Sequence, residues 1–152
     1  MKLNNPSHHQ LGFTLLEVLI TLVILAIGLL GLAGLQTTGL KNNHNAYQRS
    51  QATQLTYDMI DRMRANKVDN VNYLSATPTS HGSCDALGGC SASQMTQDDL
   101  FEWNSAITSA LASGAVGTIS ASGGLYSISI TWDDDHDGNN ANNPNFQMSF
   151  QP

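Results

Sequence analysis

The chain has 152 residues, of which 41% are hydrophobic and 12% are charged, and its formal net charge is −6 at pH 7. This length indicates one ordinary domain and excludes a multidomain enzyme. The charged share is about half the usual value, which excludes a charge-rich disordered tail and a coiled coil. Residues 68–152 contain nine acidic residues and no Lys or Arg, a net charge of −9, so nucleic-acid binding by this part is not expected.

A long apolar segment lies near the N-terminus. The 23 residues between Glu17 and Lys41 carry no charge, and Phe13–Leu35 reads FTLLEVLITLVILAIGLLGLAGL. At about 1.5 Å per residue, this stretch spans roughly 30 Å of hydrocarbon. A secretory signal peptide has a shorter apolar run and a small-x-small cleavage site, and a lipoprotein needs a Cys after the run. We therefore predict a membrane-spanning helix.

Glu17 is the one charge within that segment. A carboxylate costs about 2.5–3.5 kcal/mol at the centre of a bilayer, which favours a residue kept for a partner. Alternatively, Glu17 lies near the helix end, where it reaches the interface and interacts favourably with the helix dipole. Gly12 and Phe13 precede it, and Glu17 is the fifth residue counted from Phe13. With this arrangement, the run GFTLLEVLITLVILAIG resembles the start of the type IV pilin family.

The resemblance implies a processing site. In that family, a dedicated membrane peptidase cuts after the leader Gly on the cytoplasmic side and methylates the new N-terminal Phe. It implies cleavage after Gly12, methylation of Phe13, and neutralisation by Glu17 of the N-terminal amine of a neighbouring subunit during assembly. The expected parts are a cleaved leader at 1–12, an N-terminal helix at 13–66 whose first part is transmembrane, and a periplasmic globular head at 67–152.

Three glycines, Gly28, Gly31 and Gly34, recur within the apolar run. Each lowers helix propensity by nearly 1 kcal/mol relative to Ala. Small residues also let helices approach closely in lipid. A packing role and a hinge role both remain open, and the resemblance implies a helix bundle as the filament core.

The helix is predicted to continue to Asn66, because apolar residues recur at helical spacing without a Pro: Tyr47, Ala52, Leu55, Met59, Ile60 and Met63. The predicted exposed face carries Gln48, Gln51, Gln54, Asp58, Asp61 and Arg62. Asp58 and Arg62 are expected to form a solvated pair worth a few tenths of a kcal/mol. The run DMIDRMRAN at 58–66 resembles the PilV subgroup of minor pilins, the type IV pilus modification proteins.

Two cysteines, Cys84 and Cys90, lie in a polar loop region. A zinc site is disfavoured because it needs four ligands, usually in closer C-x2-C pairs, and His81 does not complete a set. We predict a disulfide that closes a seven-residue loop. A disulfide implies an oxidising compartment, here the bacterial periplasm, which places the head outside the cytoplasm and Met1 inside.

The C-terminal half is predicted to contain a second helix and strands. Thr96 is the expected N-cap, Asp98 and Asp99 the first-turn acids, and Gly114 and Gly117 the stop. Leu100, Trp103, Ile107 and Leu111 would form its buried face. Strands are expected weakly at 118–120 and clearly at 125–132 and 146–150. The predicted fold class is α+β: a long N-terminal helix packed on a small antiparallel sheet with one extra helix, as in type IV pilins.

An acidic run follows the central strand. Residues 133–138 contain D-x-D-x-D-G, the first half of a calcium loop. An EF-hand needs Glu at the twelfth position, where this chain has Pro144, and no helices are predicted to flank the loop. We therefore expect a solvated turn and no cofactor. If calcium were bound, Asp133, Asp135 and Asp137 would be its ligands.

The sequence contains no H-E-x-x-H, G-x-S-x-G or P-loop motif, so an enzyme is not expected. The resemblance implies a minor pilin that primes a type IV pilus or enters it, located in the inner membrane and then in the pilus. Implied partners are other minor pilins, the major pilin, prepilin peptidase, the inner-membrane assembly machinery and a tip adhesin. Two alternatives stay open: a minor pseudopilin of type II secretion and a signal-anchored periplasmic binding module.

Overall fold

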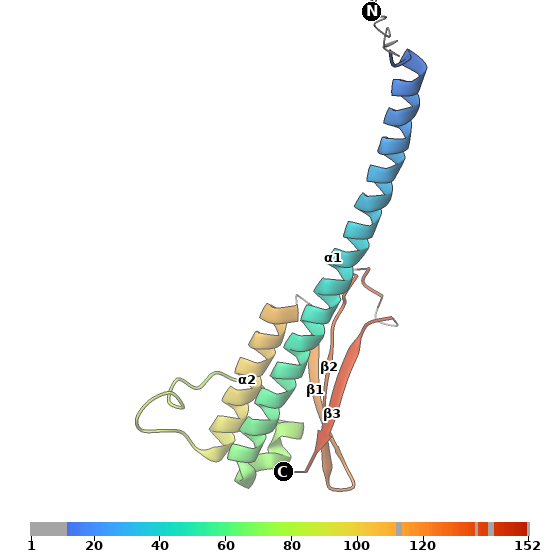
Figure 1. Cartoon of the computed structure of the whole chain (residues 1–152). Helices are drawn as coiled ribbons and strands as arrows, with labels where there is room; N and C mark the ends of the chain where they lie inside the picture. The colour runs from blue at the N-terminus through green and yellow to red at the C-terminus, as the bar shows by residue number, and fades with distance from the viewer. Residues whose placement is uncertain (1–11, 112–113, 136, 140–141, 152) are drawn as a thin grey trace, which may run out of the picture. The chain divides into compact units, whose positions relative to one another are not determined.

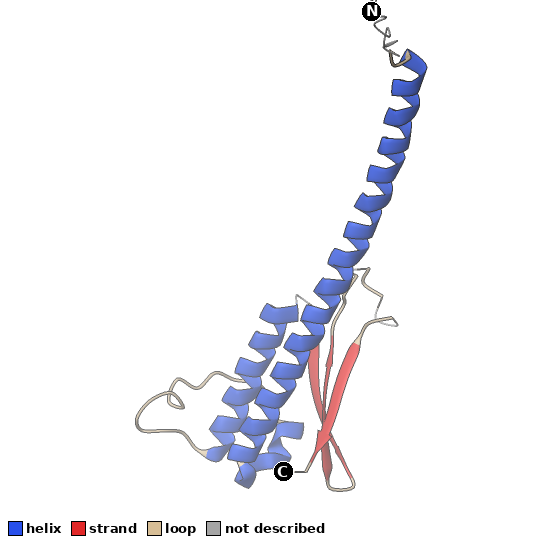
Figure 2. Cartoon of the chain, viewed as in Figure 1, coloured by secondary structure: helices blue, strands red, loops and turns tan. Residues whose placement is uncertain are grey.

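The computed structural model describes residues 12–111, 114–135, 137–139 and 142–151 (Figure 1). Its elements, in chain order, are the α-helix α1 (Leu15–Ala65), the 3-10 helix η1 (Lys67–Leu74), the α-helix α2 (Ala92–Leu111) and the strands β1 (Val116–Ser122), β2 (Leu125–Thr131) and β3 (Asn145–Phe150). The long helix, the additional helix and the small antiparallel sheet confirm the predicted fold class (Figure 2). The chain divides into two compact units, Met1–Asn42 and Asn43–Pro152.

The first unit contains the apolar half of α1. Its large apolar side chains are exposed, as expected for a surface that faces lipid or other helices rather than its own core. By length and composition, α1 can cross a membrane. Gly28, Gly31 and Gly34 lie within the continuous helix, and a Cβ atom on any of them would meet no atom within 4 Å.

The second unit has a single hydrophobic core formed by the second half of α1, η1, α2 and the sheet. Trp103 and Trp132 are each 1% exposed and are among its largest buried side chains. The other core members are Ala52, Met59, Ile60, Met63, Tyr73, Leu100, Ile107, Leu111, Ile128, Ile130 and Phe150. Most were predicted as buried from their spacing, because both helices present apolar residues every three or four positions.

The sheet has the strand order β1-β2-β3, and both pairings are antiparallel. Ile128 and Ile130 of β2 are fully buried, while the alternating Ser127 and Ser129 lie on the opposite face. The strand that we expected weakly at 118–120 is longer in the structure, where it is β1 (Val116–Ser122). A two-residue turn joins it to β2 through Gly123 and Gly124, whose φ values of 59° and 82° suit a hairpin.

Gly117 does not end the second helix, contrary to our prediction. That helix ends at Leu111, and Gly117 lies in β1 against the core. A Cβ atom on Gly117 would lie 2.4 Å from Trp103 Cη2 and 2.6 Å from Ile107 Cδ1. The Trp103 ring is held in place because its Nε1 donates a hydrogen bond to the Leu55 carbonyl of α1 at 2.9 Å. The glycine therefore lets the sheet approach α2 closely.

The prediction that Thr96 caps α2 is also wrong, because the helix begins at Ala92. Ser91 and Gln94 form a reciprocal capping box: the Gln94 backbone N–H donates to Ser91 Oγ at 3.3 Å, and the Ser91 N–H donates to Gln94 Oε1 at 3.0 Å. Thr96 is fully buried inside the helix. Asp98 and Asp99 therefore lie beyond the first turn, where they have other partners.

The surface of α1 differs from the prediction at two neighbouring positions. Gln48, expected on the exposed face, is 3% exposed, and Tyr47, expected with the apolar residues, is 59% exposed. Gln48 lies one turn before Ala52 and two turns before Thr56, which are both fully buried, so it continues the buried stripe of the helix. A polar residue at a buried position breaks the hydrophobic pattern on which the prediction depended.

Candidate functional site

The N-terminal segment brings Phe13 and Glu17 to one side of the start of α1. Phe13 lies two residues before the helix begins, and Glu17 lies in its first turn. Phe13, Glu17, Val18, Thr21 and Leu22 line a shallow hollow of about 250 Å³. The Glu17 backbone N–H donates to Thr14 Oγ1 at 3.2 Å, which caps the helix.

The Glu17 carboxylate itself is exposed, and within the described part of the chain no ion pair involves it. It is therefore available to a group from another molecule. Cleavage at Gly12 and methylation of Phe13 remain predictions, and so does the choice between packing and hinge roles for Gly28, Gly31 and Gly34.

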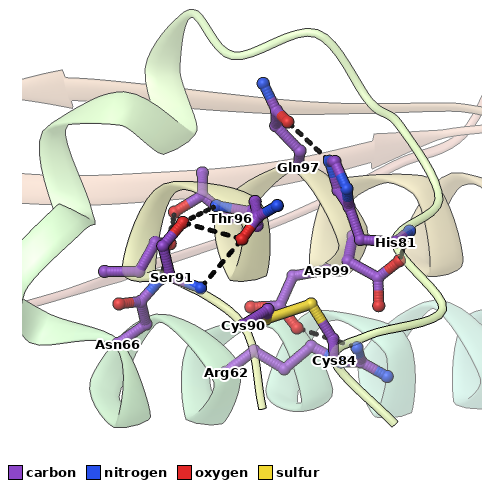
Figure 3. Close-up of a disulfide and its surroundings, with 12 residues drawn as sticks. Arg62, Asn66, His81, Cys84, Cys90, Ser91, Thr96, Gln97 and Asp99 are labelled. Atoms are coloured by element: carbon purple, nitrogen blue, oxygen red, sulfur yellow. Dashed lines mark hydrogen bonds and ion pairs between the residues drawn. A yellow bond between two sulfur atoms is a disulfide. The ribbon is translucent and has the colours of Figure 1, made fainter. Parts of the chain in front are cut away.

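A second group of polar residues surrounds Arg62, near the end of α1 (Figure 3). Arg62 Nε donates to Asp58 Oδ2 at 2.9 Å, as the sequence spacing predicted. Its Nη1 also donates to Asp99 Oδ1 at 3.0 Å and to Glu102 Oε2 at 2.6 Å, both on α2. The expectation of a merely solvated Asp58–Arg62 pair is therefore wrong. Arg62 links the two helices, and we call these four residues, with Tyr73, the Arg62 cluster.

Asp99 lies at the centre of the Arg62 cluster and is 6% exposed. The Tyr73 hydroxyl, from η1, donates to Asp99 Oδ2. Burial raises the pKa of the Tyr73 phenol above its usual value, and the hydrogen bond to the Asp99 carboxylate raises this pKa further. Burial alone would lower the pKa of the Arg62 guanidinium, but its bonds to Glu102, Asp99 and Asp58 outweigh burial and raise it. The cluster thus holds Arg62 charged and Tyr73 neutral.

The alkaline stability of the second unit is expected to depend on Tyr73. Because its pKa is raised in the folded chain, its contribution is fully present below about pH 10 and is lost as pH rises through the folded pKa. The free energy of unfolding of the wild type should fall more steeply above pH 10 than that of Tyr73→Phe, which has no phenol to ionise. Urea denaturation at stepped pH measures this, and equal slopes would contradict it.

A second polar group joins the same three helices beside the Arg62 cluster. Asn66 Nδ2, just after α1, donates to Thr96 Oγ1 at 3.0 Å and to the Ala92 carbonyl at 2.9 Å. Thr96 Oγ1 donates to Asp69 Oδ2 of η1 at 2.7 Å. We did not predict η1, whose φ and ψ angles at Asp69 are not helical. Its position follows from these long-range contacts and not from a local sequence pattern.

The loop between η1 and α2 is attached to α2 at several points. The His81 backbone N–H donates to Asp98, and His81 Nε2 lies 2.7 Å from Gln97 Oε1. Cys84 and Cys90 form the predicted disulfide (Figure 3), and Cys90 lines one hollow together with Arg62 and Asp99. Asp98 and Asp99, expected in the first turn of the helix, instead bind the His81 backbone in the loop and Arg62 of α1. The signal that could have revealed this is the S-x-x-Q pattern at 91–94, which starts α2 one turn earlier.

The disulfide should stabilise the second unit by about 2 kcal/mol, the loop-entropy value for a ring of seven residues. We expect the double variant Cys84→Ser/Cys90→Ser to unfold at a lower temperature by a corresponding amount. Thermal denaturation followed by tryptophan fluorescence measures this. A thiol reductant should shift the wild type to the same midpoint and leave the double variant unchanged; a reductant without effect on the wild type would refute the prediction.

The acidic loop brings together the three carboxylates named as calcium candidates. One ligand oxygen from each of Asp133, Asp135 and Asp137 lies within 4.8 Å of the others. The same side chains accept hydrogen bonds from the turn: Asp133 Oδ2 from the Gly138 N–H at 3.1 Å, and Asp137 Oδ1 from the Asn139 N–H at 2.6 Å. Such bonds are typical of ordinary Asx turns. His136 lies outside the described residues, and a solvated turn remains our expectation.

Two family models match the chain, one over the N-terminal segment and the other over a region that contains most of the Arg62 cluster. Residues 7–33 match the prokaryotic N-terminal methylation motif, which includes Gly12, Phe13 and Glu17. Residues 34–101 match a family described as Tt1218-like, type IV pilin Tt1218. Together the two matches cover residues 7–101, so this part of the chain is similar to type IV pilins. The second match covers most of the contacts between α1, η1 and the start of α2. No curated protein sequence and no solved structure matches the chain.

The similarity to type IV pilins bears on two of the polar groups described above, Glu17 and the Arg62 cluster. The methylation motif and the long apolar helix fit a pilin anchored in the inner membrane. Type IV pilins are structural proteins that interact with other pilins and with the pilus assembly machinery. The Arg62 cluster, by contrast, connects parts of one chain. The exposed Glu17 takes part in none of the ion pairs among the described residues.

Proposed function

We propose that this protein is a minor pilin of the PilV type, which primes type IV pilus assembly or is incorporated in the filament. The observation that carries the proposal is the exposed Glu17 carboxylate in the first turn of α1, beside Phe13 and inside the methylation motif. An exposed acid on a membrane-length helix needs a cationic partner, because its transfer into hydrocarbon is costly. The methylated amine of a neighbouring subunit would supply that cation.

The proposed life cycle follows from the same segment. Prepilin peptidase removes residues 1–12 in the inner membrane and methylates Phe13. The disulfide between Cys84 and Cys90 supports a head in the periplasm. Assembly then moves the subunit from the membrane into a pilus at the cell surface, with other minor pilins, the major pilin and a tip adhesin as partners. Gly28, Gly31 and Gly34 allow close helix packing in the filament core.

Glu17→Gln tests this function, because it removes the charge and keeps the side-chain shape. In a strain lacking the gene, wild-type protein should restore surface pili and twitching, and Glu17→Gln should restore neither while reaching the membrane in normal amounts. Asp61→Asn is the matched control, since Asp61 is an exposed acid of the same helix with its side chain 75% exposed. Electron microscopy counts the pili, and mass spectrometry checks that the mature chain begins at Phe13.

The two alternatives give different results in the same strains. A signal-anchored binding module should function with Glu17→Gln as well as with the wild type, and its N-terminus should still be Met1. A minor pseudopilin should be processed, yet its deletion should block protein secretion and leave pili unchanged. Either result would refute the proposed role.

A further inference from the structure

A groove lies on the second unit. Its walls are Pro78, from the loop before the disulfide, and the outward face of α2, and its volume is about 440 Å³. The lining residues are Pro78, Phe101, Asn104, Ser105, Thr108 and Ser109. The Thr79 N–H donates to the Gln97 carbonyl at 3.0 Å and so fixes the adjacent Pro78 beside the helix. This volume falls within the range of sites for small molecules.

The hydroxyl groups of the groove are oriented by the helix. Ser105 Oγ donates to the Phe101 carbonyl at 2.9 Å, Thr108 Oγ1 to the Asn104 carbonyl at 2.9 Å, and Ser109 Oγ to the Ser105 carbonyl at 2.8 Å. Each hydroxyl hydrogen is thus used within α2, and each oxygen keeps its capacity to accept a bond. A ligand that fits these three side chains must donate hydrogen bonds.

The groove also has an apolar wall. Phe101 is 42% exposed although its neighbours Leu100 and Trp103 are buried in the core. Its ring and the ring of Pro78 both line the groove. An exposed aromatic face is best covered by a flat apolar surface. The ligand must therefore combine an apolar face with donor groups around its edge.

The charges of the groove lining and of the second unit restrict the class of ligand further. None of the described residues that line the groove is charged. Residues 43–152 contain four Lys or Arg against eleven Asp or Glu, a net charge of −7. This field repels nucleic acids and acidic polysaccharides. A lysine ammonium would lose its water without meeting a carboxylate in the lining. Protein interfaces are also depleted in serine, which disfavours a protein partner for this surface.

We propose that the groove binds a sugar ring of a neutral polysaccharide. The C–H face of the ring lies on Phe101 and Pro78, and its hydroxyls donate to Ser105, Thr108 and Ser109. Asn104 contributes an amide that both donates and accepts. The site needs nothing from the N-terminal helix, so this inference does not depend on the proposed role in pilus assembly.

The test uses the full chain in a detergent without a sugar headgroup. Isothermal titration calorimetry measures binding of three neutral probes, cellohexaose, chitohexaose and maltohexaose, and of two charged ones, oligogalacturonate and an oligolysine peptide. We expect at least one neutral probe to bind and neither charged probe to do so. If all three neutral probes fail, or if a charged probe binds as tightly, the proposal is wrong.

Two variants locate the site. Phe101→Ala should weaken binding about tenfold, the effect of losing one stacking contact, and Phe101→Tyr should restore it. Leu125→Ala is the matched control, because Leu125 is a large apolar residue of β2 that is 49% exposed and is absent from the groove lining. The affinity of Leu125→Ala for the neutral probe should equal that of the wild type. Equal losses in Phe101→Ala and Leu125→Ala, or no loss in Phe101→Ala with an unchanged melting temperature, would overturn the assignment.

Discussion

Replacing Arg62 with Met is expected to destabilise the second unit by about 2–4 kcal/mol, the usual cost of leaving a buried charge without its partner. Met keeps the aliphatic stem and removes the guanidinium. The cost arises mainly at Asp99, whose side chain is 9% exposed, because the side chains of Asp58 and Glu102 are 47% and 43% exposed and can be solvated. Chemical denaturation of the full chain in detergent, followed by the fluorescence of Trp103 and Trp132, measures the change.

Arg64→Met provides the control for this substitution. Arg64 lies two residues away on the same helix, with its side chain 52% exposed, in a long ion pair of 3.6 Å with Asp61 and over the Phe150 ring. Contacts of this kind contribute about 1 kcal/mol or less. The double variant Arg62→Met/Asp99→Asn should recover part of the loss, because the buried charge is then gone. If Arg62→Met and Arg64→Met cost the same, the Arg62 cluster contributes no more than a surface pair.

A methyl group at Gly117 is expected to destabilise the second unit by about 1–3 kcal/mol, the typical cost of overpacking a core. In Gly117→Ala, the new Cβ would lie 2.4 Å from Trp103 Cη2, so the ring or the strand must move. The ring cannot move freely because its Nε1 is bonded to the Leu55 carbonyl. Gly117→Val should be worse than Gly117→Ala. Thermal denaturation gives the order of the midpoints.

Gly88→Ala is the corresponding control, since a Cβ at Gly88 meets nothing within 4 Å. Its melting temperature should match that of the wild type. Ile107→Val combined with Gly117→Ala should be less destabilised than the sum of the two single changes, because removing Ile107 Cδ1 opens the space that the new methyl needs. Exact additivity would show that the clash is relieved elsewhere.

Local patterns in the sequence predicted the elements with strong periodicity. The uncharged run after Glu17 gave the long helix, Leu100 to Leu111 gave the buried face of α2, and the alternation at 125–132 gave β2. In each case the period of the apolar residues matches the geometry of the element. The Cys84–Cys90 disulfide was also predictable, because its loop is short and no zinc ligands accompany it.

Features that depend on distant contacts were not predictable in this way. Arg62 and Asp99 are 37 positions apart, so only their nearest neighbours in sequence could suggest partners. We predicted that Gly117 ends the second helix, because glycine ends many helices. In the structure it lies in β1 and lets that strand approach Trp103 closely. Gln48 is buried although it is polar. In all three cases tertiary packing, and not local propensity, determines the environment.

The start of α1 at Leu15 has a consequence for the order of events in the cell. The helix α1 begins at Leu15, so a chain that begins at Phe13 would keep the whole of it. The buried positions of α1 begin at Gln48, more than thirty residues farther along the chain. We therefore expect the C-terminal unit to fold whether or not the proposed cleavage after Gly12 has taken place. If so, the precursor would already carry a folded head.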